Sequence, residues 1–279
     1  SRGAGKNPGW IESYLKEPET FADRVTAGDS HDVNPARVLW RGILPGLLDM
    51  PDHEVNTFIN GYLQTYVERD VRVLGEIREL GAFGTFIGIL GGLTAQEINH
   101  SLLGREVGIS PVTARKWLDL LMATFQWHEL PGFSGNVLKR VSGKRKGHFA
   151  DTGLACALQR LGSPEAVPVA RFAGSLFESF VVNDIRGQLA ALPSLPDLYH
   201  WRTSGGAEVD LILDYNGMLF PIEMKFTTRL SGNDQRGIRA FRDTYPRRNV
   251  APGLIVYVGS EVRRVSDVAT AIPWTATIG

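Results

Sequence analysis

A predicted β-hairpin over residues 207–225 constrains the fold of this chain more than any other stretch. Its centre is Asn216-Gly217, a dipeptide typical of type I′ turns because both central residues of such a turn have positive φ. A two-residue loop fixes the register of the two strands. Counting back from the turn pairs apolar residues on one face, namely Tyr215 with Met218, Leu213 with Phe220, Leu211 with Ile222 and Val209 with Met224. We therefore expect an antiparallel pair with this face in the core.

The other face of the predicted hairpin carries charge. The same register pairs Asp210 with Glu223 and Glu208 with Lys225. Two carboxylates directly opposite each other destabilise a sheet. A hard divalent cation such as Mg²⁺ would offset that cost, because Mg²⁺ prefers one or two carboxylates together with water and phosphate oxygens. The alternative is a solvated polar face with an ordinary Glu208–Lys225 ion pair.

A further acidic residue, Glu178, falls in a predicted amphipathic helix from residue 172 to about residue 189. Glu178 shares a helical face with Val181, Val182 and Ile185. A carboxylate on an apolar face needs a partner. The alternative is that Glu178 lies in the first helical turn, where the helix dipole favours an acid.

Composition narrows the class of protein. The chain has 279 residues, and its 30 basic and 30 acidic residues cancel, so any basic site must be local. Cys156 is the single cysteine, which excludes an internal disulfide and fits a reducing cytoplasm, where we expect the protein to reside. We expect no membrane span and no secretory signal. Gly5-Lys6 is followed by Asn7, so we expect no P-loop and no ATPase site in this chain.

Residues 1–75 are predicted to be largely helical, and residues 76–162 match a winged helix-turn-helix. Its first helix would cover residues 76–90, and a capping box from Thr94 to Glu97 would open a second helix ending near Val107. Ser110 as N-cap and Pro111 at the first helical position predict a third helix to about Phe125. This third helix would bury Ala114, Trp117, Leu118 and Leu121. Residues 126–130 and 148–150 would be the wing strands.

Basic residues of this segment are candidates for nucleic-acid binding. They lie early in the third helix and in the predicted wing: Arg115, Lys116, Lys139, Arg140, Lys144, Arg145 and Lys146. Contacts from such residues to phosphates give affinity that depends on salt and not on sequence. The alternatives are a solvated wing tip or a protein-interaction module.

The last part of the chain predicts an α/β domain. Residues 163–168 form a proline-bearing linker, which we expect to be the domain boundary. After the helix of Glu178, the pattern predicts a strand over 198–203, the hairpin, a helix over 234–245 and a strand over 253–258. Strand, hairpin, helix and strand is the order expected of an α/β sheet.

The spacing of Asp210, twelve residues, and then Glu223-Met224-Lys225 resembles the core of the PD-(D/E)xK nucleases. Val209 replaces the usual proline of that family, and Glu178 matches the acidic residue that those nucleases draw from a preceding helix. The resemblance implies a restriction-endonuclease-like fold for residues 163–279.

Seven short motifs in order resemble the C-terminal region of bacterial and archaeal AAA-type ATPases that carry a domain of unknown function. They begin at Leu39, Tyr66, Phe149, Gly174, Trp201, Glu208 and Ile222. The resemblance implies an ATPase lid remnant over 1–75, the winged helix over 76–162 and the nuclease-like domain over 163–279. It also implies an ATPase module, which this chain lacks, as a partner. Self-association stays open, and no membrane partner is expected.

Two functional hypotheses follow. In the first, the protein is a Mg²⁺- or Mn²⁺-dependent deoxyribonuclease. Asp210, Glu223 and the Met224 carbonyl would bind the metal, Glu178 would orient a metal-bound water, and Lys225 would stabilise developing negative charge. In the second, the winged helix binds DNA or a protein partner, and the nuclease-like domain is a non-catalytic scaffold.

Overall fold

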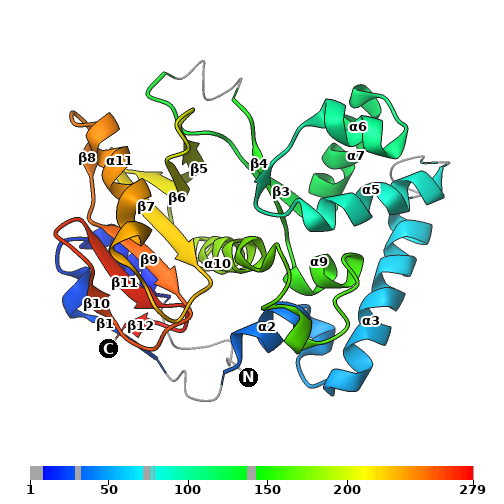
Figure 1. The fold of residues 1–279 in the computed structure, drawn as a ribbon, viewed down its shortest axis with the longest axis horizontal. Coiled ribbons are helices and arrows are strands. Elements are labelled where there is room, and N and C mark those ends of the chain that lie inside the picture. Colours follow the sequence, from blue (N-terminus) through cyan, green and yellow to red (C-terminus); the bar gives the residue numbers. More distant parts are fainter. Residues whose placement is uncertain (1–8, 29–32, 72–76, 78, 137–142, 279) are drawn as a thin grey trace. The chain divides into compact units, whose positions relative to one another are not determined.

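Helices dominate the first half of the chain and strands the second, which makes the fold a mixed α+β structure (Figure 1). A computed structural model describes residues 9–28, 33–71, 77, 79–136 and 143–278. The chain divides into two compact units, each assembled from separate segments. A sheet unit comprises residues 1–33, 130–143 and 181–279, and a helical unit comprises residues 34–129 and 144–180.

The helical unit contains short helices and a small three-stranded sheet with the order β2-β4-β3. Its helices are α2 (Pro35–Arg41), α3 (Asp52–Thr65), α5 (Leu80–Gly92), α6 (His100–Val107), α7 (Pro111–Ala123) and α9 (Thr152–Leu158), with 3-10 turns at η2 (Pro45–Leu47) and η4 (Pro164–Ala166) and a π-helix at η3 (Tyr66–Val71). Its strands are β2 (Gln96–Glu97), β3 (Trp127–Leu130) and β4 (Lys146–Phe149). Helix α9 packs against α2, α3 and α5.

Helix α7 forms as its sequence predicts. The Ser110 hydroxyl accepts the Thr113 N–H at 3.0 Å, and Pro111 occupies the first helical position. The predicted face is buried, and its central residue Trp117 packs edge-on against Phe83 and Phe86 of α5, with ring centroids 5.3 and 5.2 Å apart. The apolar period therefore predicts both the helix and its buried side.

One helix boundary predicted from the sequence is wrong. The second helix begins after Asn99, whose side chain accepts two backbone N–H groups, and not at Thr94. The Thr94 hydroxyl is buried and bonded to Ser179 and to the Phe149 N–H, while Gln96–Glu97 pairs with β4.

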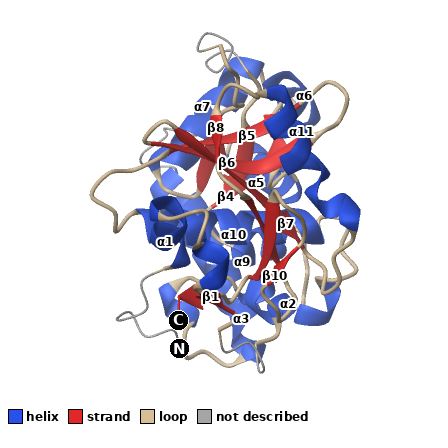
Figure 2. Cartoon of the chain, turned by 90° about the vertical axis from the view of Figure 1, so that its left-hand side faces the viewer, coloured by secondary structure: helices blue, strands red, loops and turns tan. Residues whose placement is uncertain are grey.

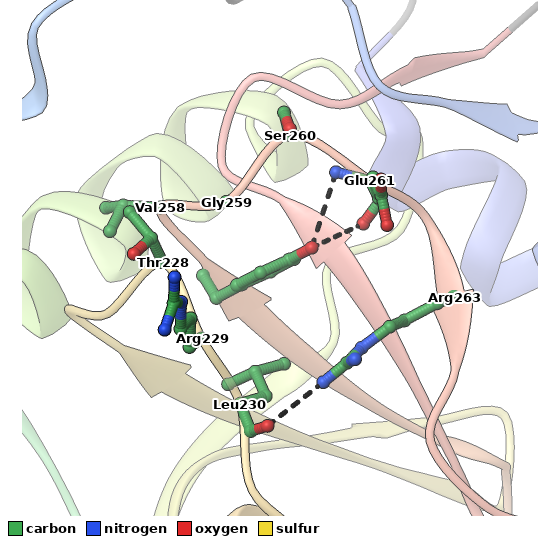
Figure 3. Close-up of a pocket in the computed structure, with 9 residues that line it drawn as sticks. Thr228, Arg229, Leu230, Val258, Gly259, Ser260, Glu261 and Arg263 are labelled. Carbon is green, nitrogen blue, oxygen red and sulfur yellow. Dashed lines mark hydrogen bonds between the residues drawn. The ribbon is translucent and has the colours of Figure 1, made fainter.

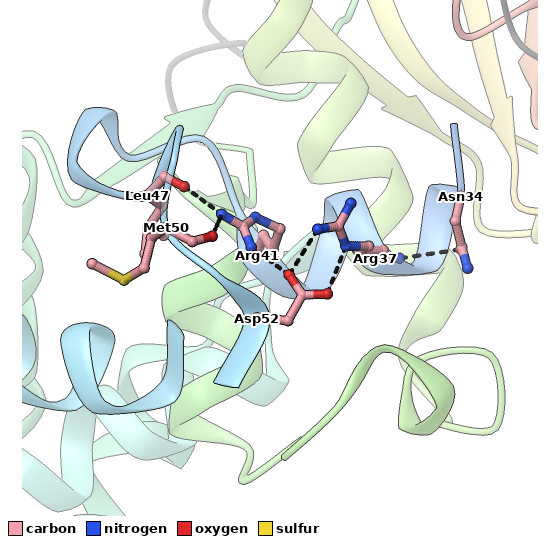
Figure 4. A network of polar contacts seen from close by, with 6 residues as sticks. All are labelled: Asn34, Arg37, Arg41, Leu47, Met50 and Asp52. Atoms are coloured by element: carbon pink, nitrogen blue, oxygen red, sulfur yellow. Dashed lines mark hydrogen bonds and ion pairs between the residues drawn. The ribbon is translucent and has the colours of Figure 1, made fainter. Parts of the chain in front are cut away.

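A charged network holds α2 against the start of α3 (Figure 4). Arg37 donates two hydrogen bonds to Asp52 at 2.7 and 3.0 Å, and Arg41 donates to the same carboxylate. Arg41 also donates to the backbone carbonyls of Leu47 and Met50. Arg41 belongs to the short motif that begins at Leu39, and its contacts give this motif a structural role.

The sheet unit is built on a seven-stranded mixed sheet with the order β10-β11-β9-β7-β6-β5, and β8 pairs with β7 beside this path. Its strands are β5 (Asp197–Arg202), β6 (Glu208–Tyr215), β7 (Met218–Lys225), β8 (Asn249–Val250), β9 (Gly253–Tyr257), β10 (Arg263–Arg264) and β11 (Ala269–Pro273). Its other elements are α1 (Trp10–Lys16), η1 (Phe21–Asp23), η5 (Gly232–Gln235), α11 (Arg236–Thr244) and the two-stranded pair β1 (Val25–Thr26) with β12 (Thr277–Ile278). Helix α10 (Ala173–Leu189) contributes residues to both units.

The predicted hairpin is confirmed. Asn216 and Gly217 have φ values of 49° and 79°, and Tyr215 pairs with Met218. Helix α11 packs on β6 and β7 (Figure 2), so Phe241 joins Val209 and Ile212 in a buried cluster. Strand β11, which no sequence pattern predicted, extends the sheet in parallel to β9.

Within the part of the chain that the structure describes, no helix is both long enough and apolar enough to cross a lipid bilayer.

Candidate functional site

The hydrogen-bonded pairing of β6 with β7 runs from the turn to Leu211 and Ile222 and stops there. A bulge explains the change. On the opposite edge of β6, Tyr199 pairs with Ile212 but Trp201 pairs with Val209, so two β6 residues lie opposite one β5 residue. The bulge breaks the two-residue alternation on which the predicted register depends.

The sequence prediction therefore fails for the last three ladder pairs, Asp210–Glu223, Glu208–Lys225 and Val209–Met224. On the opposite edge of β6, Val209 and Glu208 still pair with Trp201 and Arg202 of β5. The Asp210 side chain bonds to β7 where a backbone carbonyl would bond in a regular ladder: its Oδ2 accepts the Met224 N–H at 2.8 Å. This contact holds the Asp210 side chain between the two strands.

The two acidic side chains remain in contact although their backbones do not pair. Asp210 is 5% exposed and Glu223 is 2% exposed. The Asp210 carboxylate lies close enough to Glu223 for its charge to act on that carboxyl group. Lys225 Nζ lies 2.8 Å from Glu223 Oε2, and its side chain is 31% exposed, so the ammonium lies where the site reaches solvent. The structure thus brings together Asp210, Glu223 and Lys225.

Burial and neighbouring charge set the protonation of these groups. Burial, and then the Asp210 charge, raise the pKa of Glu223 well above its ordinary value. Burial lowers the pKa of Lys225, but the Glu223 and Asp210 charges more than offset this, so the Lys225 pKa lies above its ordinary value. The pKa of the Glu223 carboxyl group and that of the Lys225 ammonium are therefore both shifted upward, which favours the protonated form of each group.

The raised pKa of Glu223 predicts how stability depends on pH. The folded pKa exceeds the unfolded value of about 4.3, so this group's contribution is complete below that value and is lost as pH rises through the folded pKa. In EDTA, the melting temperature of the wild type should fall more steeply than that of Glu223→Gln as the pH rises above about 5. Glu208→Gln, at a half-exposed position, should follow the wild type. Parallel curves for wild type and Glu223→Gln would contradict this assignment.

Gly237, the second residue of α11, lies directly against the site. A Cβ placed on Gly237 would overlap the Glu208 carbonyl oxygen and Oε1 of Glu223. This residue was not predicted from the sequence, because a glycine inside a helical pattern indicates at most close packing and does not show what it packs against. Close approach of α11 therefore forms one wall around the Glu223 carboxyl group.

Gly237→Ala should displace the first turn of α11 and lower the free energy of unfolding by about 1–3 kcal/mol, as overpacked sites do. Chemical denaturation measures this change. Gly232→Ala is the matched control, because a Cβ there meets no atom within 4 Å. Equal midpoints for the two variants would show that α11 is not held as close as described.

Glu178 pairs with Lys146, a residue that the sequence did not indicate as its partner. Its Oε1 lies 2.7 Å from Lys146 Nζ, and the two side chains are 11% and 9% exposed. The expectation that Glu178 needs a partner is confirmed. The alternative that it lies in the first helical turn is wrong, because α10 begins at Ala173. Glu178 and Lys146 belong to the helical unit, whereas Asp210, Glu223 and Lys225 belong to the sheet unit.

The donor set of the sheet unit fits a hard cation. A buried Glu223 carboxyl group with a raised pKa would release its proton on binding a divalent ion, and Mg²⁺ needs only one or two protein carboxylates. No group of three or more His, Cys, Asp or Glu side chains among the described residues is arranged as a metal site. Glu178 and the Met224 carbonyl as further ligands stay predictions.

The predicted nucleic-acid residues differ in their surroundings. Arg115 and Arg145 both pair with Glu129, at 3.4 and 3.1 Å, and Glu129 is 2% exposed. Lys144 pairs with Glu97 at 3.4 Å, and Lys116 is exposed. Lys139 and Arg140 lie outside the described residues. Lys146 is buried against Glu178, so its predicted contact with phosphate would require that pair to separate.

Comparison with known proteins gives two domain matches and two relatives. Residues 34–165 match a domain of unknown function, DUF8612, and residues 173–277 match another, DUF4143, which is typically associated with the C-terminal regions of AAA-type ATPases. The second match contains all four predicted catalytic residues.

Two curated mycobacterial proteins are similar to this chain. Uncharacterised proteins of Mycobacterium tuberculosis and Mycobacterium bovis are each 28% identical to it over 232 residues, or 83% of this chain. The matched region is 51% of either relative, so the chain spans about half the length of the curated relatives it matches. No solved structure matches this chain.

Proposed function

We propose that Asp210, Glu223 and Lys225 form a metal-dependent phosphodiesterase site, and that the protein is a nuclease acting on DNA. The observation that carries the proposal is the buried Asp210–Glu223 carboxyl pair, with the Lys225 ammonium 2.8 Å from Glu223 at the solvent side. Burying two adjacent acids costs stability unless a ligand uses them. A cation and a phosphate oxygen together provide that use.

Each residue has a specific role in the proposal. A bound Mg²⁺ or Mn²⁺ would polarise the phosphate and lower the pKa of a water molecule. Asp210 and Glu223 would hold the ion, and the Met224 carbonyl could complete the protein donors. Lys225, released from Glu223 by the ion, would stabilise negative charge on the phosphate oxygens. Glu178 would orient the attacking water only if its pair with Lys146 opens.

The order of elements supports the proposed nuclease-like domain. Helix α10, strand β5, the β6–β7 hairpin, helix α11 and strand β9 follow one another along the chain, as the resemblance to PD-(D/E)xK nucleases requires. The sequence α5-β2-α6-α7-β3-β4 in turn supports a winged helix. In that arrangement Arg115, Lys116, Lys144 and Arg145 are the described candidates for DNA contact.

We also propose that the chain acts as the C-terminal part of an AAA-type ATPase. The match of residues 173–277 to DUF4143 supports this proposal, because that domain is typically associated with such C-terminal regions. A second candidate function is a non-catalytic interaction module. The Glu178–Lys146 pair favours it, because a buried ion pair removes the third acidic residue from the proposed chemistry.

Cleavage of supercoiled plasmid and of single-stranded DNA, in Mg²⁺, Mn²⁺ or EDTA, tests the proposal. The wild type should cut in either metal and not in EDTA, and Lys225→Met should cut about 100-fold more slowly, the cost of losing one charge-stabilising donor. The scaffold alternative predicts no cutting by the wild type and unchanged DNA binding in Lys225→Met.

A further inference from the structure

A recess of about 660 Å³ opens in the sheet unit beyond the ends of β7 and β9. Two loops form its walls: Thr228, Arg229 and Leu230 follow β7, while residues 257–261 and 263 lead from β9 to β10. Figure 3 shows Arg229 on one side of the recess and Arg263 on the other. The volume exceeds what one phosphate group needs and suits a nucleotide unit.

The charge of the recess favours an anion. Both arginines are exposed, and neither guanidinium forms an ion pair within the described part of the chain. By contrast, Arg202, Arg239 and Arg248 of the same unit each lie beside a carboxylate. Glu261 is the single acidic residue in the lining, so the two arginines leave the recess with a positive balance. Guanidinium groups are the side chains best suited to phosphate.

Backbone contacts hold both walls in place. Arg263 Nη2 donates to the Leu230 carbonyl at 3.2 Å, which fixes the guanidinium across the mouth of the recess. The Thr227 hydroxyl accepts the Arg229 N–H at 3.2 Å and donates to the Arg229 carbonyl at 3.0 Å. The Tyr257 hydroxyl donates to the Glu261 carbonyl at 2.8 Å. Preorganised walls of this kind reduce the entropy lost on binding.

The recess and the carboxylate site are linked through one pair of neighbouring strand residues. Lys225, the last residue of β7, pairs with Tyr257 of β9, and Tyr257 lines the recess. Thr228 follows Lys225 by three residues. A chain whose phosphate lies at Lys225 would therefore bring a neighbouring phosphate towards Arg229 and Arg263.

We propose that this recess binds a backbone phosphate of the nucleic acid next to the phosphate that is cut, through Arg229 and Arg263. The inference rests on the proposed nuclease function for the identity of the ligand. Binding at the recess needs no metal, because the arginines supply the positive charge. It can therefore be measured separately from cleavage.

The experiment is the binding of a fluorescein-labelled 16-nucleotide single-stranded DNA to the full 279-residue chain in EDTA. Arg229→Ala/Arg263→Ala should weaken binding about 10- to 100-fold, and should reduce the slope of log Kd against log salt by about 1–2. Arg264→Ala is the matched control, because Arg264 is the exposed neighbour of Arg263 but lines a different pocket. It should change Kd less than about 2-fold.

The outcomes separate this inference from the nuclease proposal. Equal losses in Arg263→Ala and Arg264→Ala would overturn the recess as a specific site, whether or not the protein cuts DNA. Displacement of the DNA by polyglutamate at equal charge concentration would also overturn it, in favour of an acidic peptide. A specific loss in the double variant supports the recess even if the wild type fails to cut.

Discussion

Replacing Asp210 by asparagine should reduce the rate of metal-dependent cleavage more than about 100-fold. Removing a residue that only orients a metal ligand typically costs about 10- to 100-fold in activity, and the loss of a ligand itself should cost more. The fold should survive, since the amide oxygen of the new side chain can still accept the Met224 N–H that Asp210 accepts at 2.8 Å. The charge that raises the pKa of Glu223 would disappear at the same time. Initial rates of plasmid nicking in Mn²⁺, together with melting curves in EDTA, measure the two effects separately.

Asp214→Asn is the matched control for this substitution. Asp214 lies on the same strand, its side chain is 19% exposed, and it faces Arg248 at 3.8 Å instead of Glu223. Its removal should change the rate less than about 2-fold, as for other weakly paired charges. Comparable rates for Asp210→Asn and the wild type would exclude Asp210 from the chemistry and favour the scaffold.

Replacing Lys146 by methionine should lower the free energy of unfolding by about 3–5 kcal/mol, because it leaves the Glu178 carboxylate buried without its cation. The double variant Lys146→Met/Glu178→Gln should recover most of this loss, since no charge is then buried. Denaturation midpoints measured at pH 7 provide the comparison.

Lys144→Met serves as the control, because the Lys144 side chain is 70% exposed and its pair with Glu97 is worth at most about 1 kcal/mol. A loss as small in Lys146→Met as in Lys144→Met would show that the Lys146–Glu178 pair is open in solution. In that case Glu178 would be free to orient the attacking water, and Lys146 would be free to contact phosphate.

Local sequence rules predict the elements that carry this site. Asn216-Gly217 predicts the hairpin because positive φ is required at both positions, and Ser110-Pro111 predicts the start of α7 because cap and proline agree. These features depend on neighbours in the sequence, so a single sequence contains the information. The hairpin brings the strands of Asp210 and Glu223 side by side, but the bulge in β6 displaces these two residues from the predicted register.

Features decided by tertiary contacts could not be predicted in this way. The bulge in β6 depends on how β5 pairs with its other edge, and the partner of Glu178 lies 32 residues earlier in the chain. Thr94 resembles an N-cap in the sequence, but its hydroxyl is hydrogen-bonded to Ser179, and the helix begins after Asn99. Strand β11 has a weak strand pattern and forms because β9 offers it a parallel edge. The division 1–75, 76–162 and 163–279 stays a prediction.

Calorimetric titration of the metal-free chain with Mn²⁺, in two buffers of different ionisation enthalpy, tests whether the Asp210–Glu223 pair is a metal site. We expect Mn²⁺ to bind with release of a proton, because the raised pKa of Glu223 favours its protonated form in the metal-free protein. Glu223→Gln should abolish both binding and proton release, while Glu208→Gln should retain them. No binding by the wild type at millimolar Mn²⁺, or identical binding by Glu223→Gln, would contradict the claim that this carboxyl pair is a metal site.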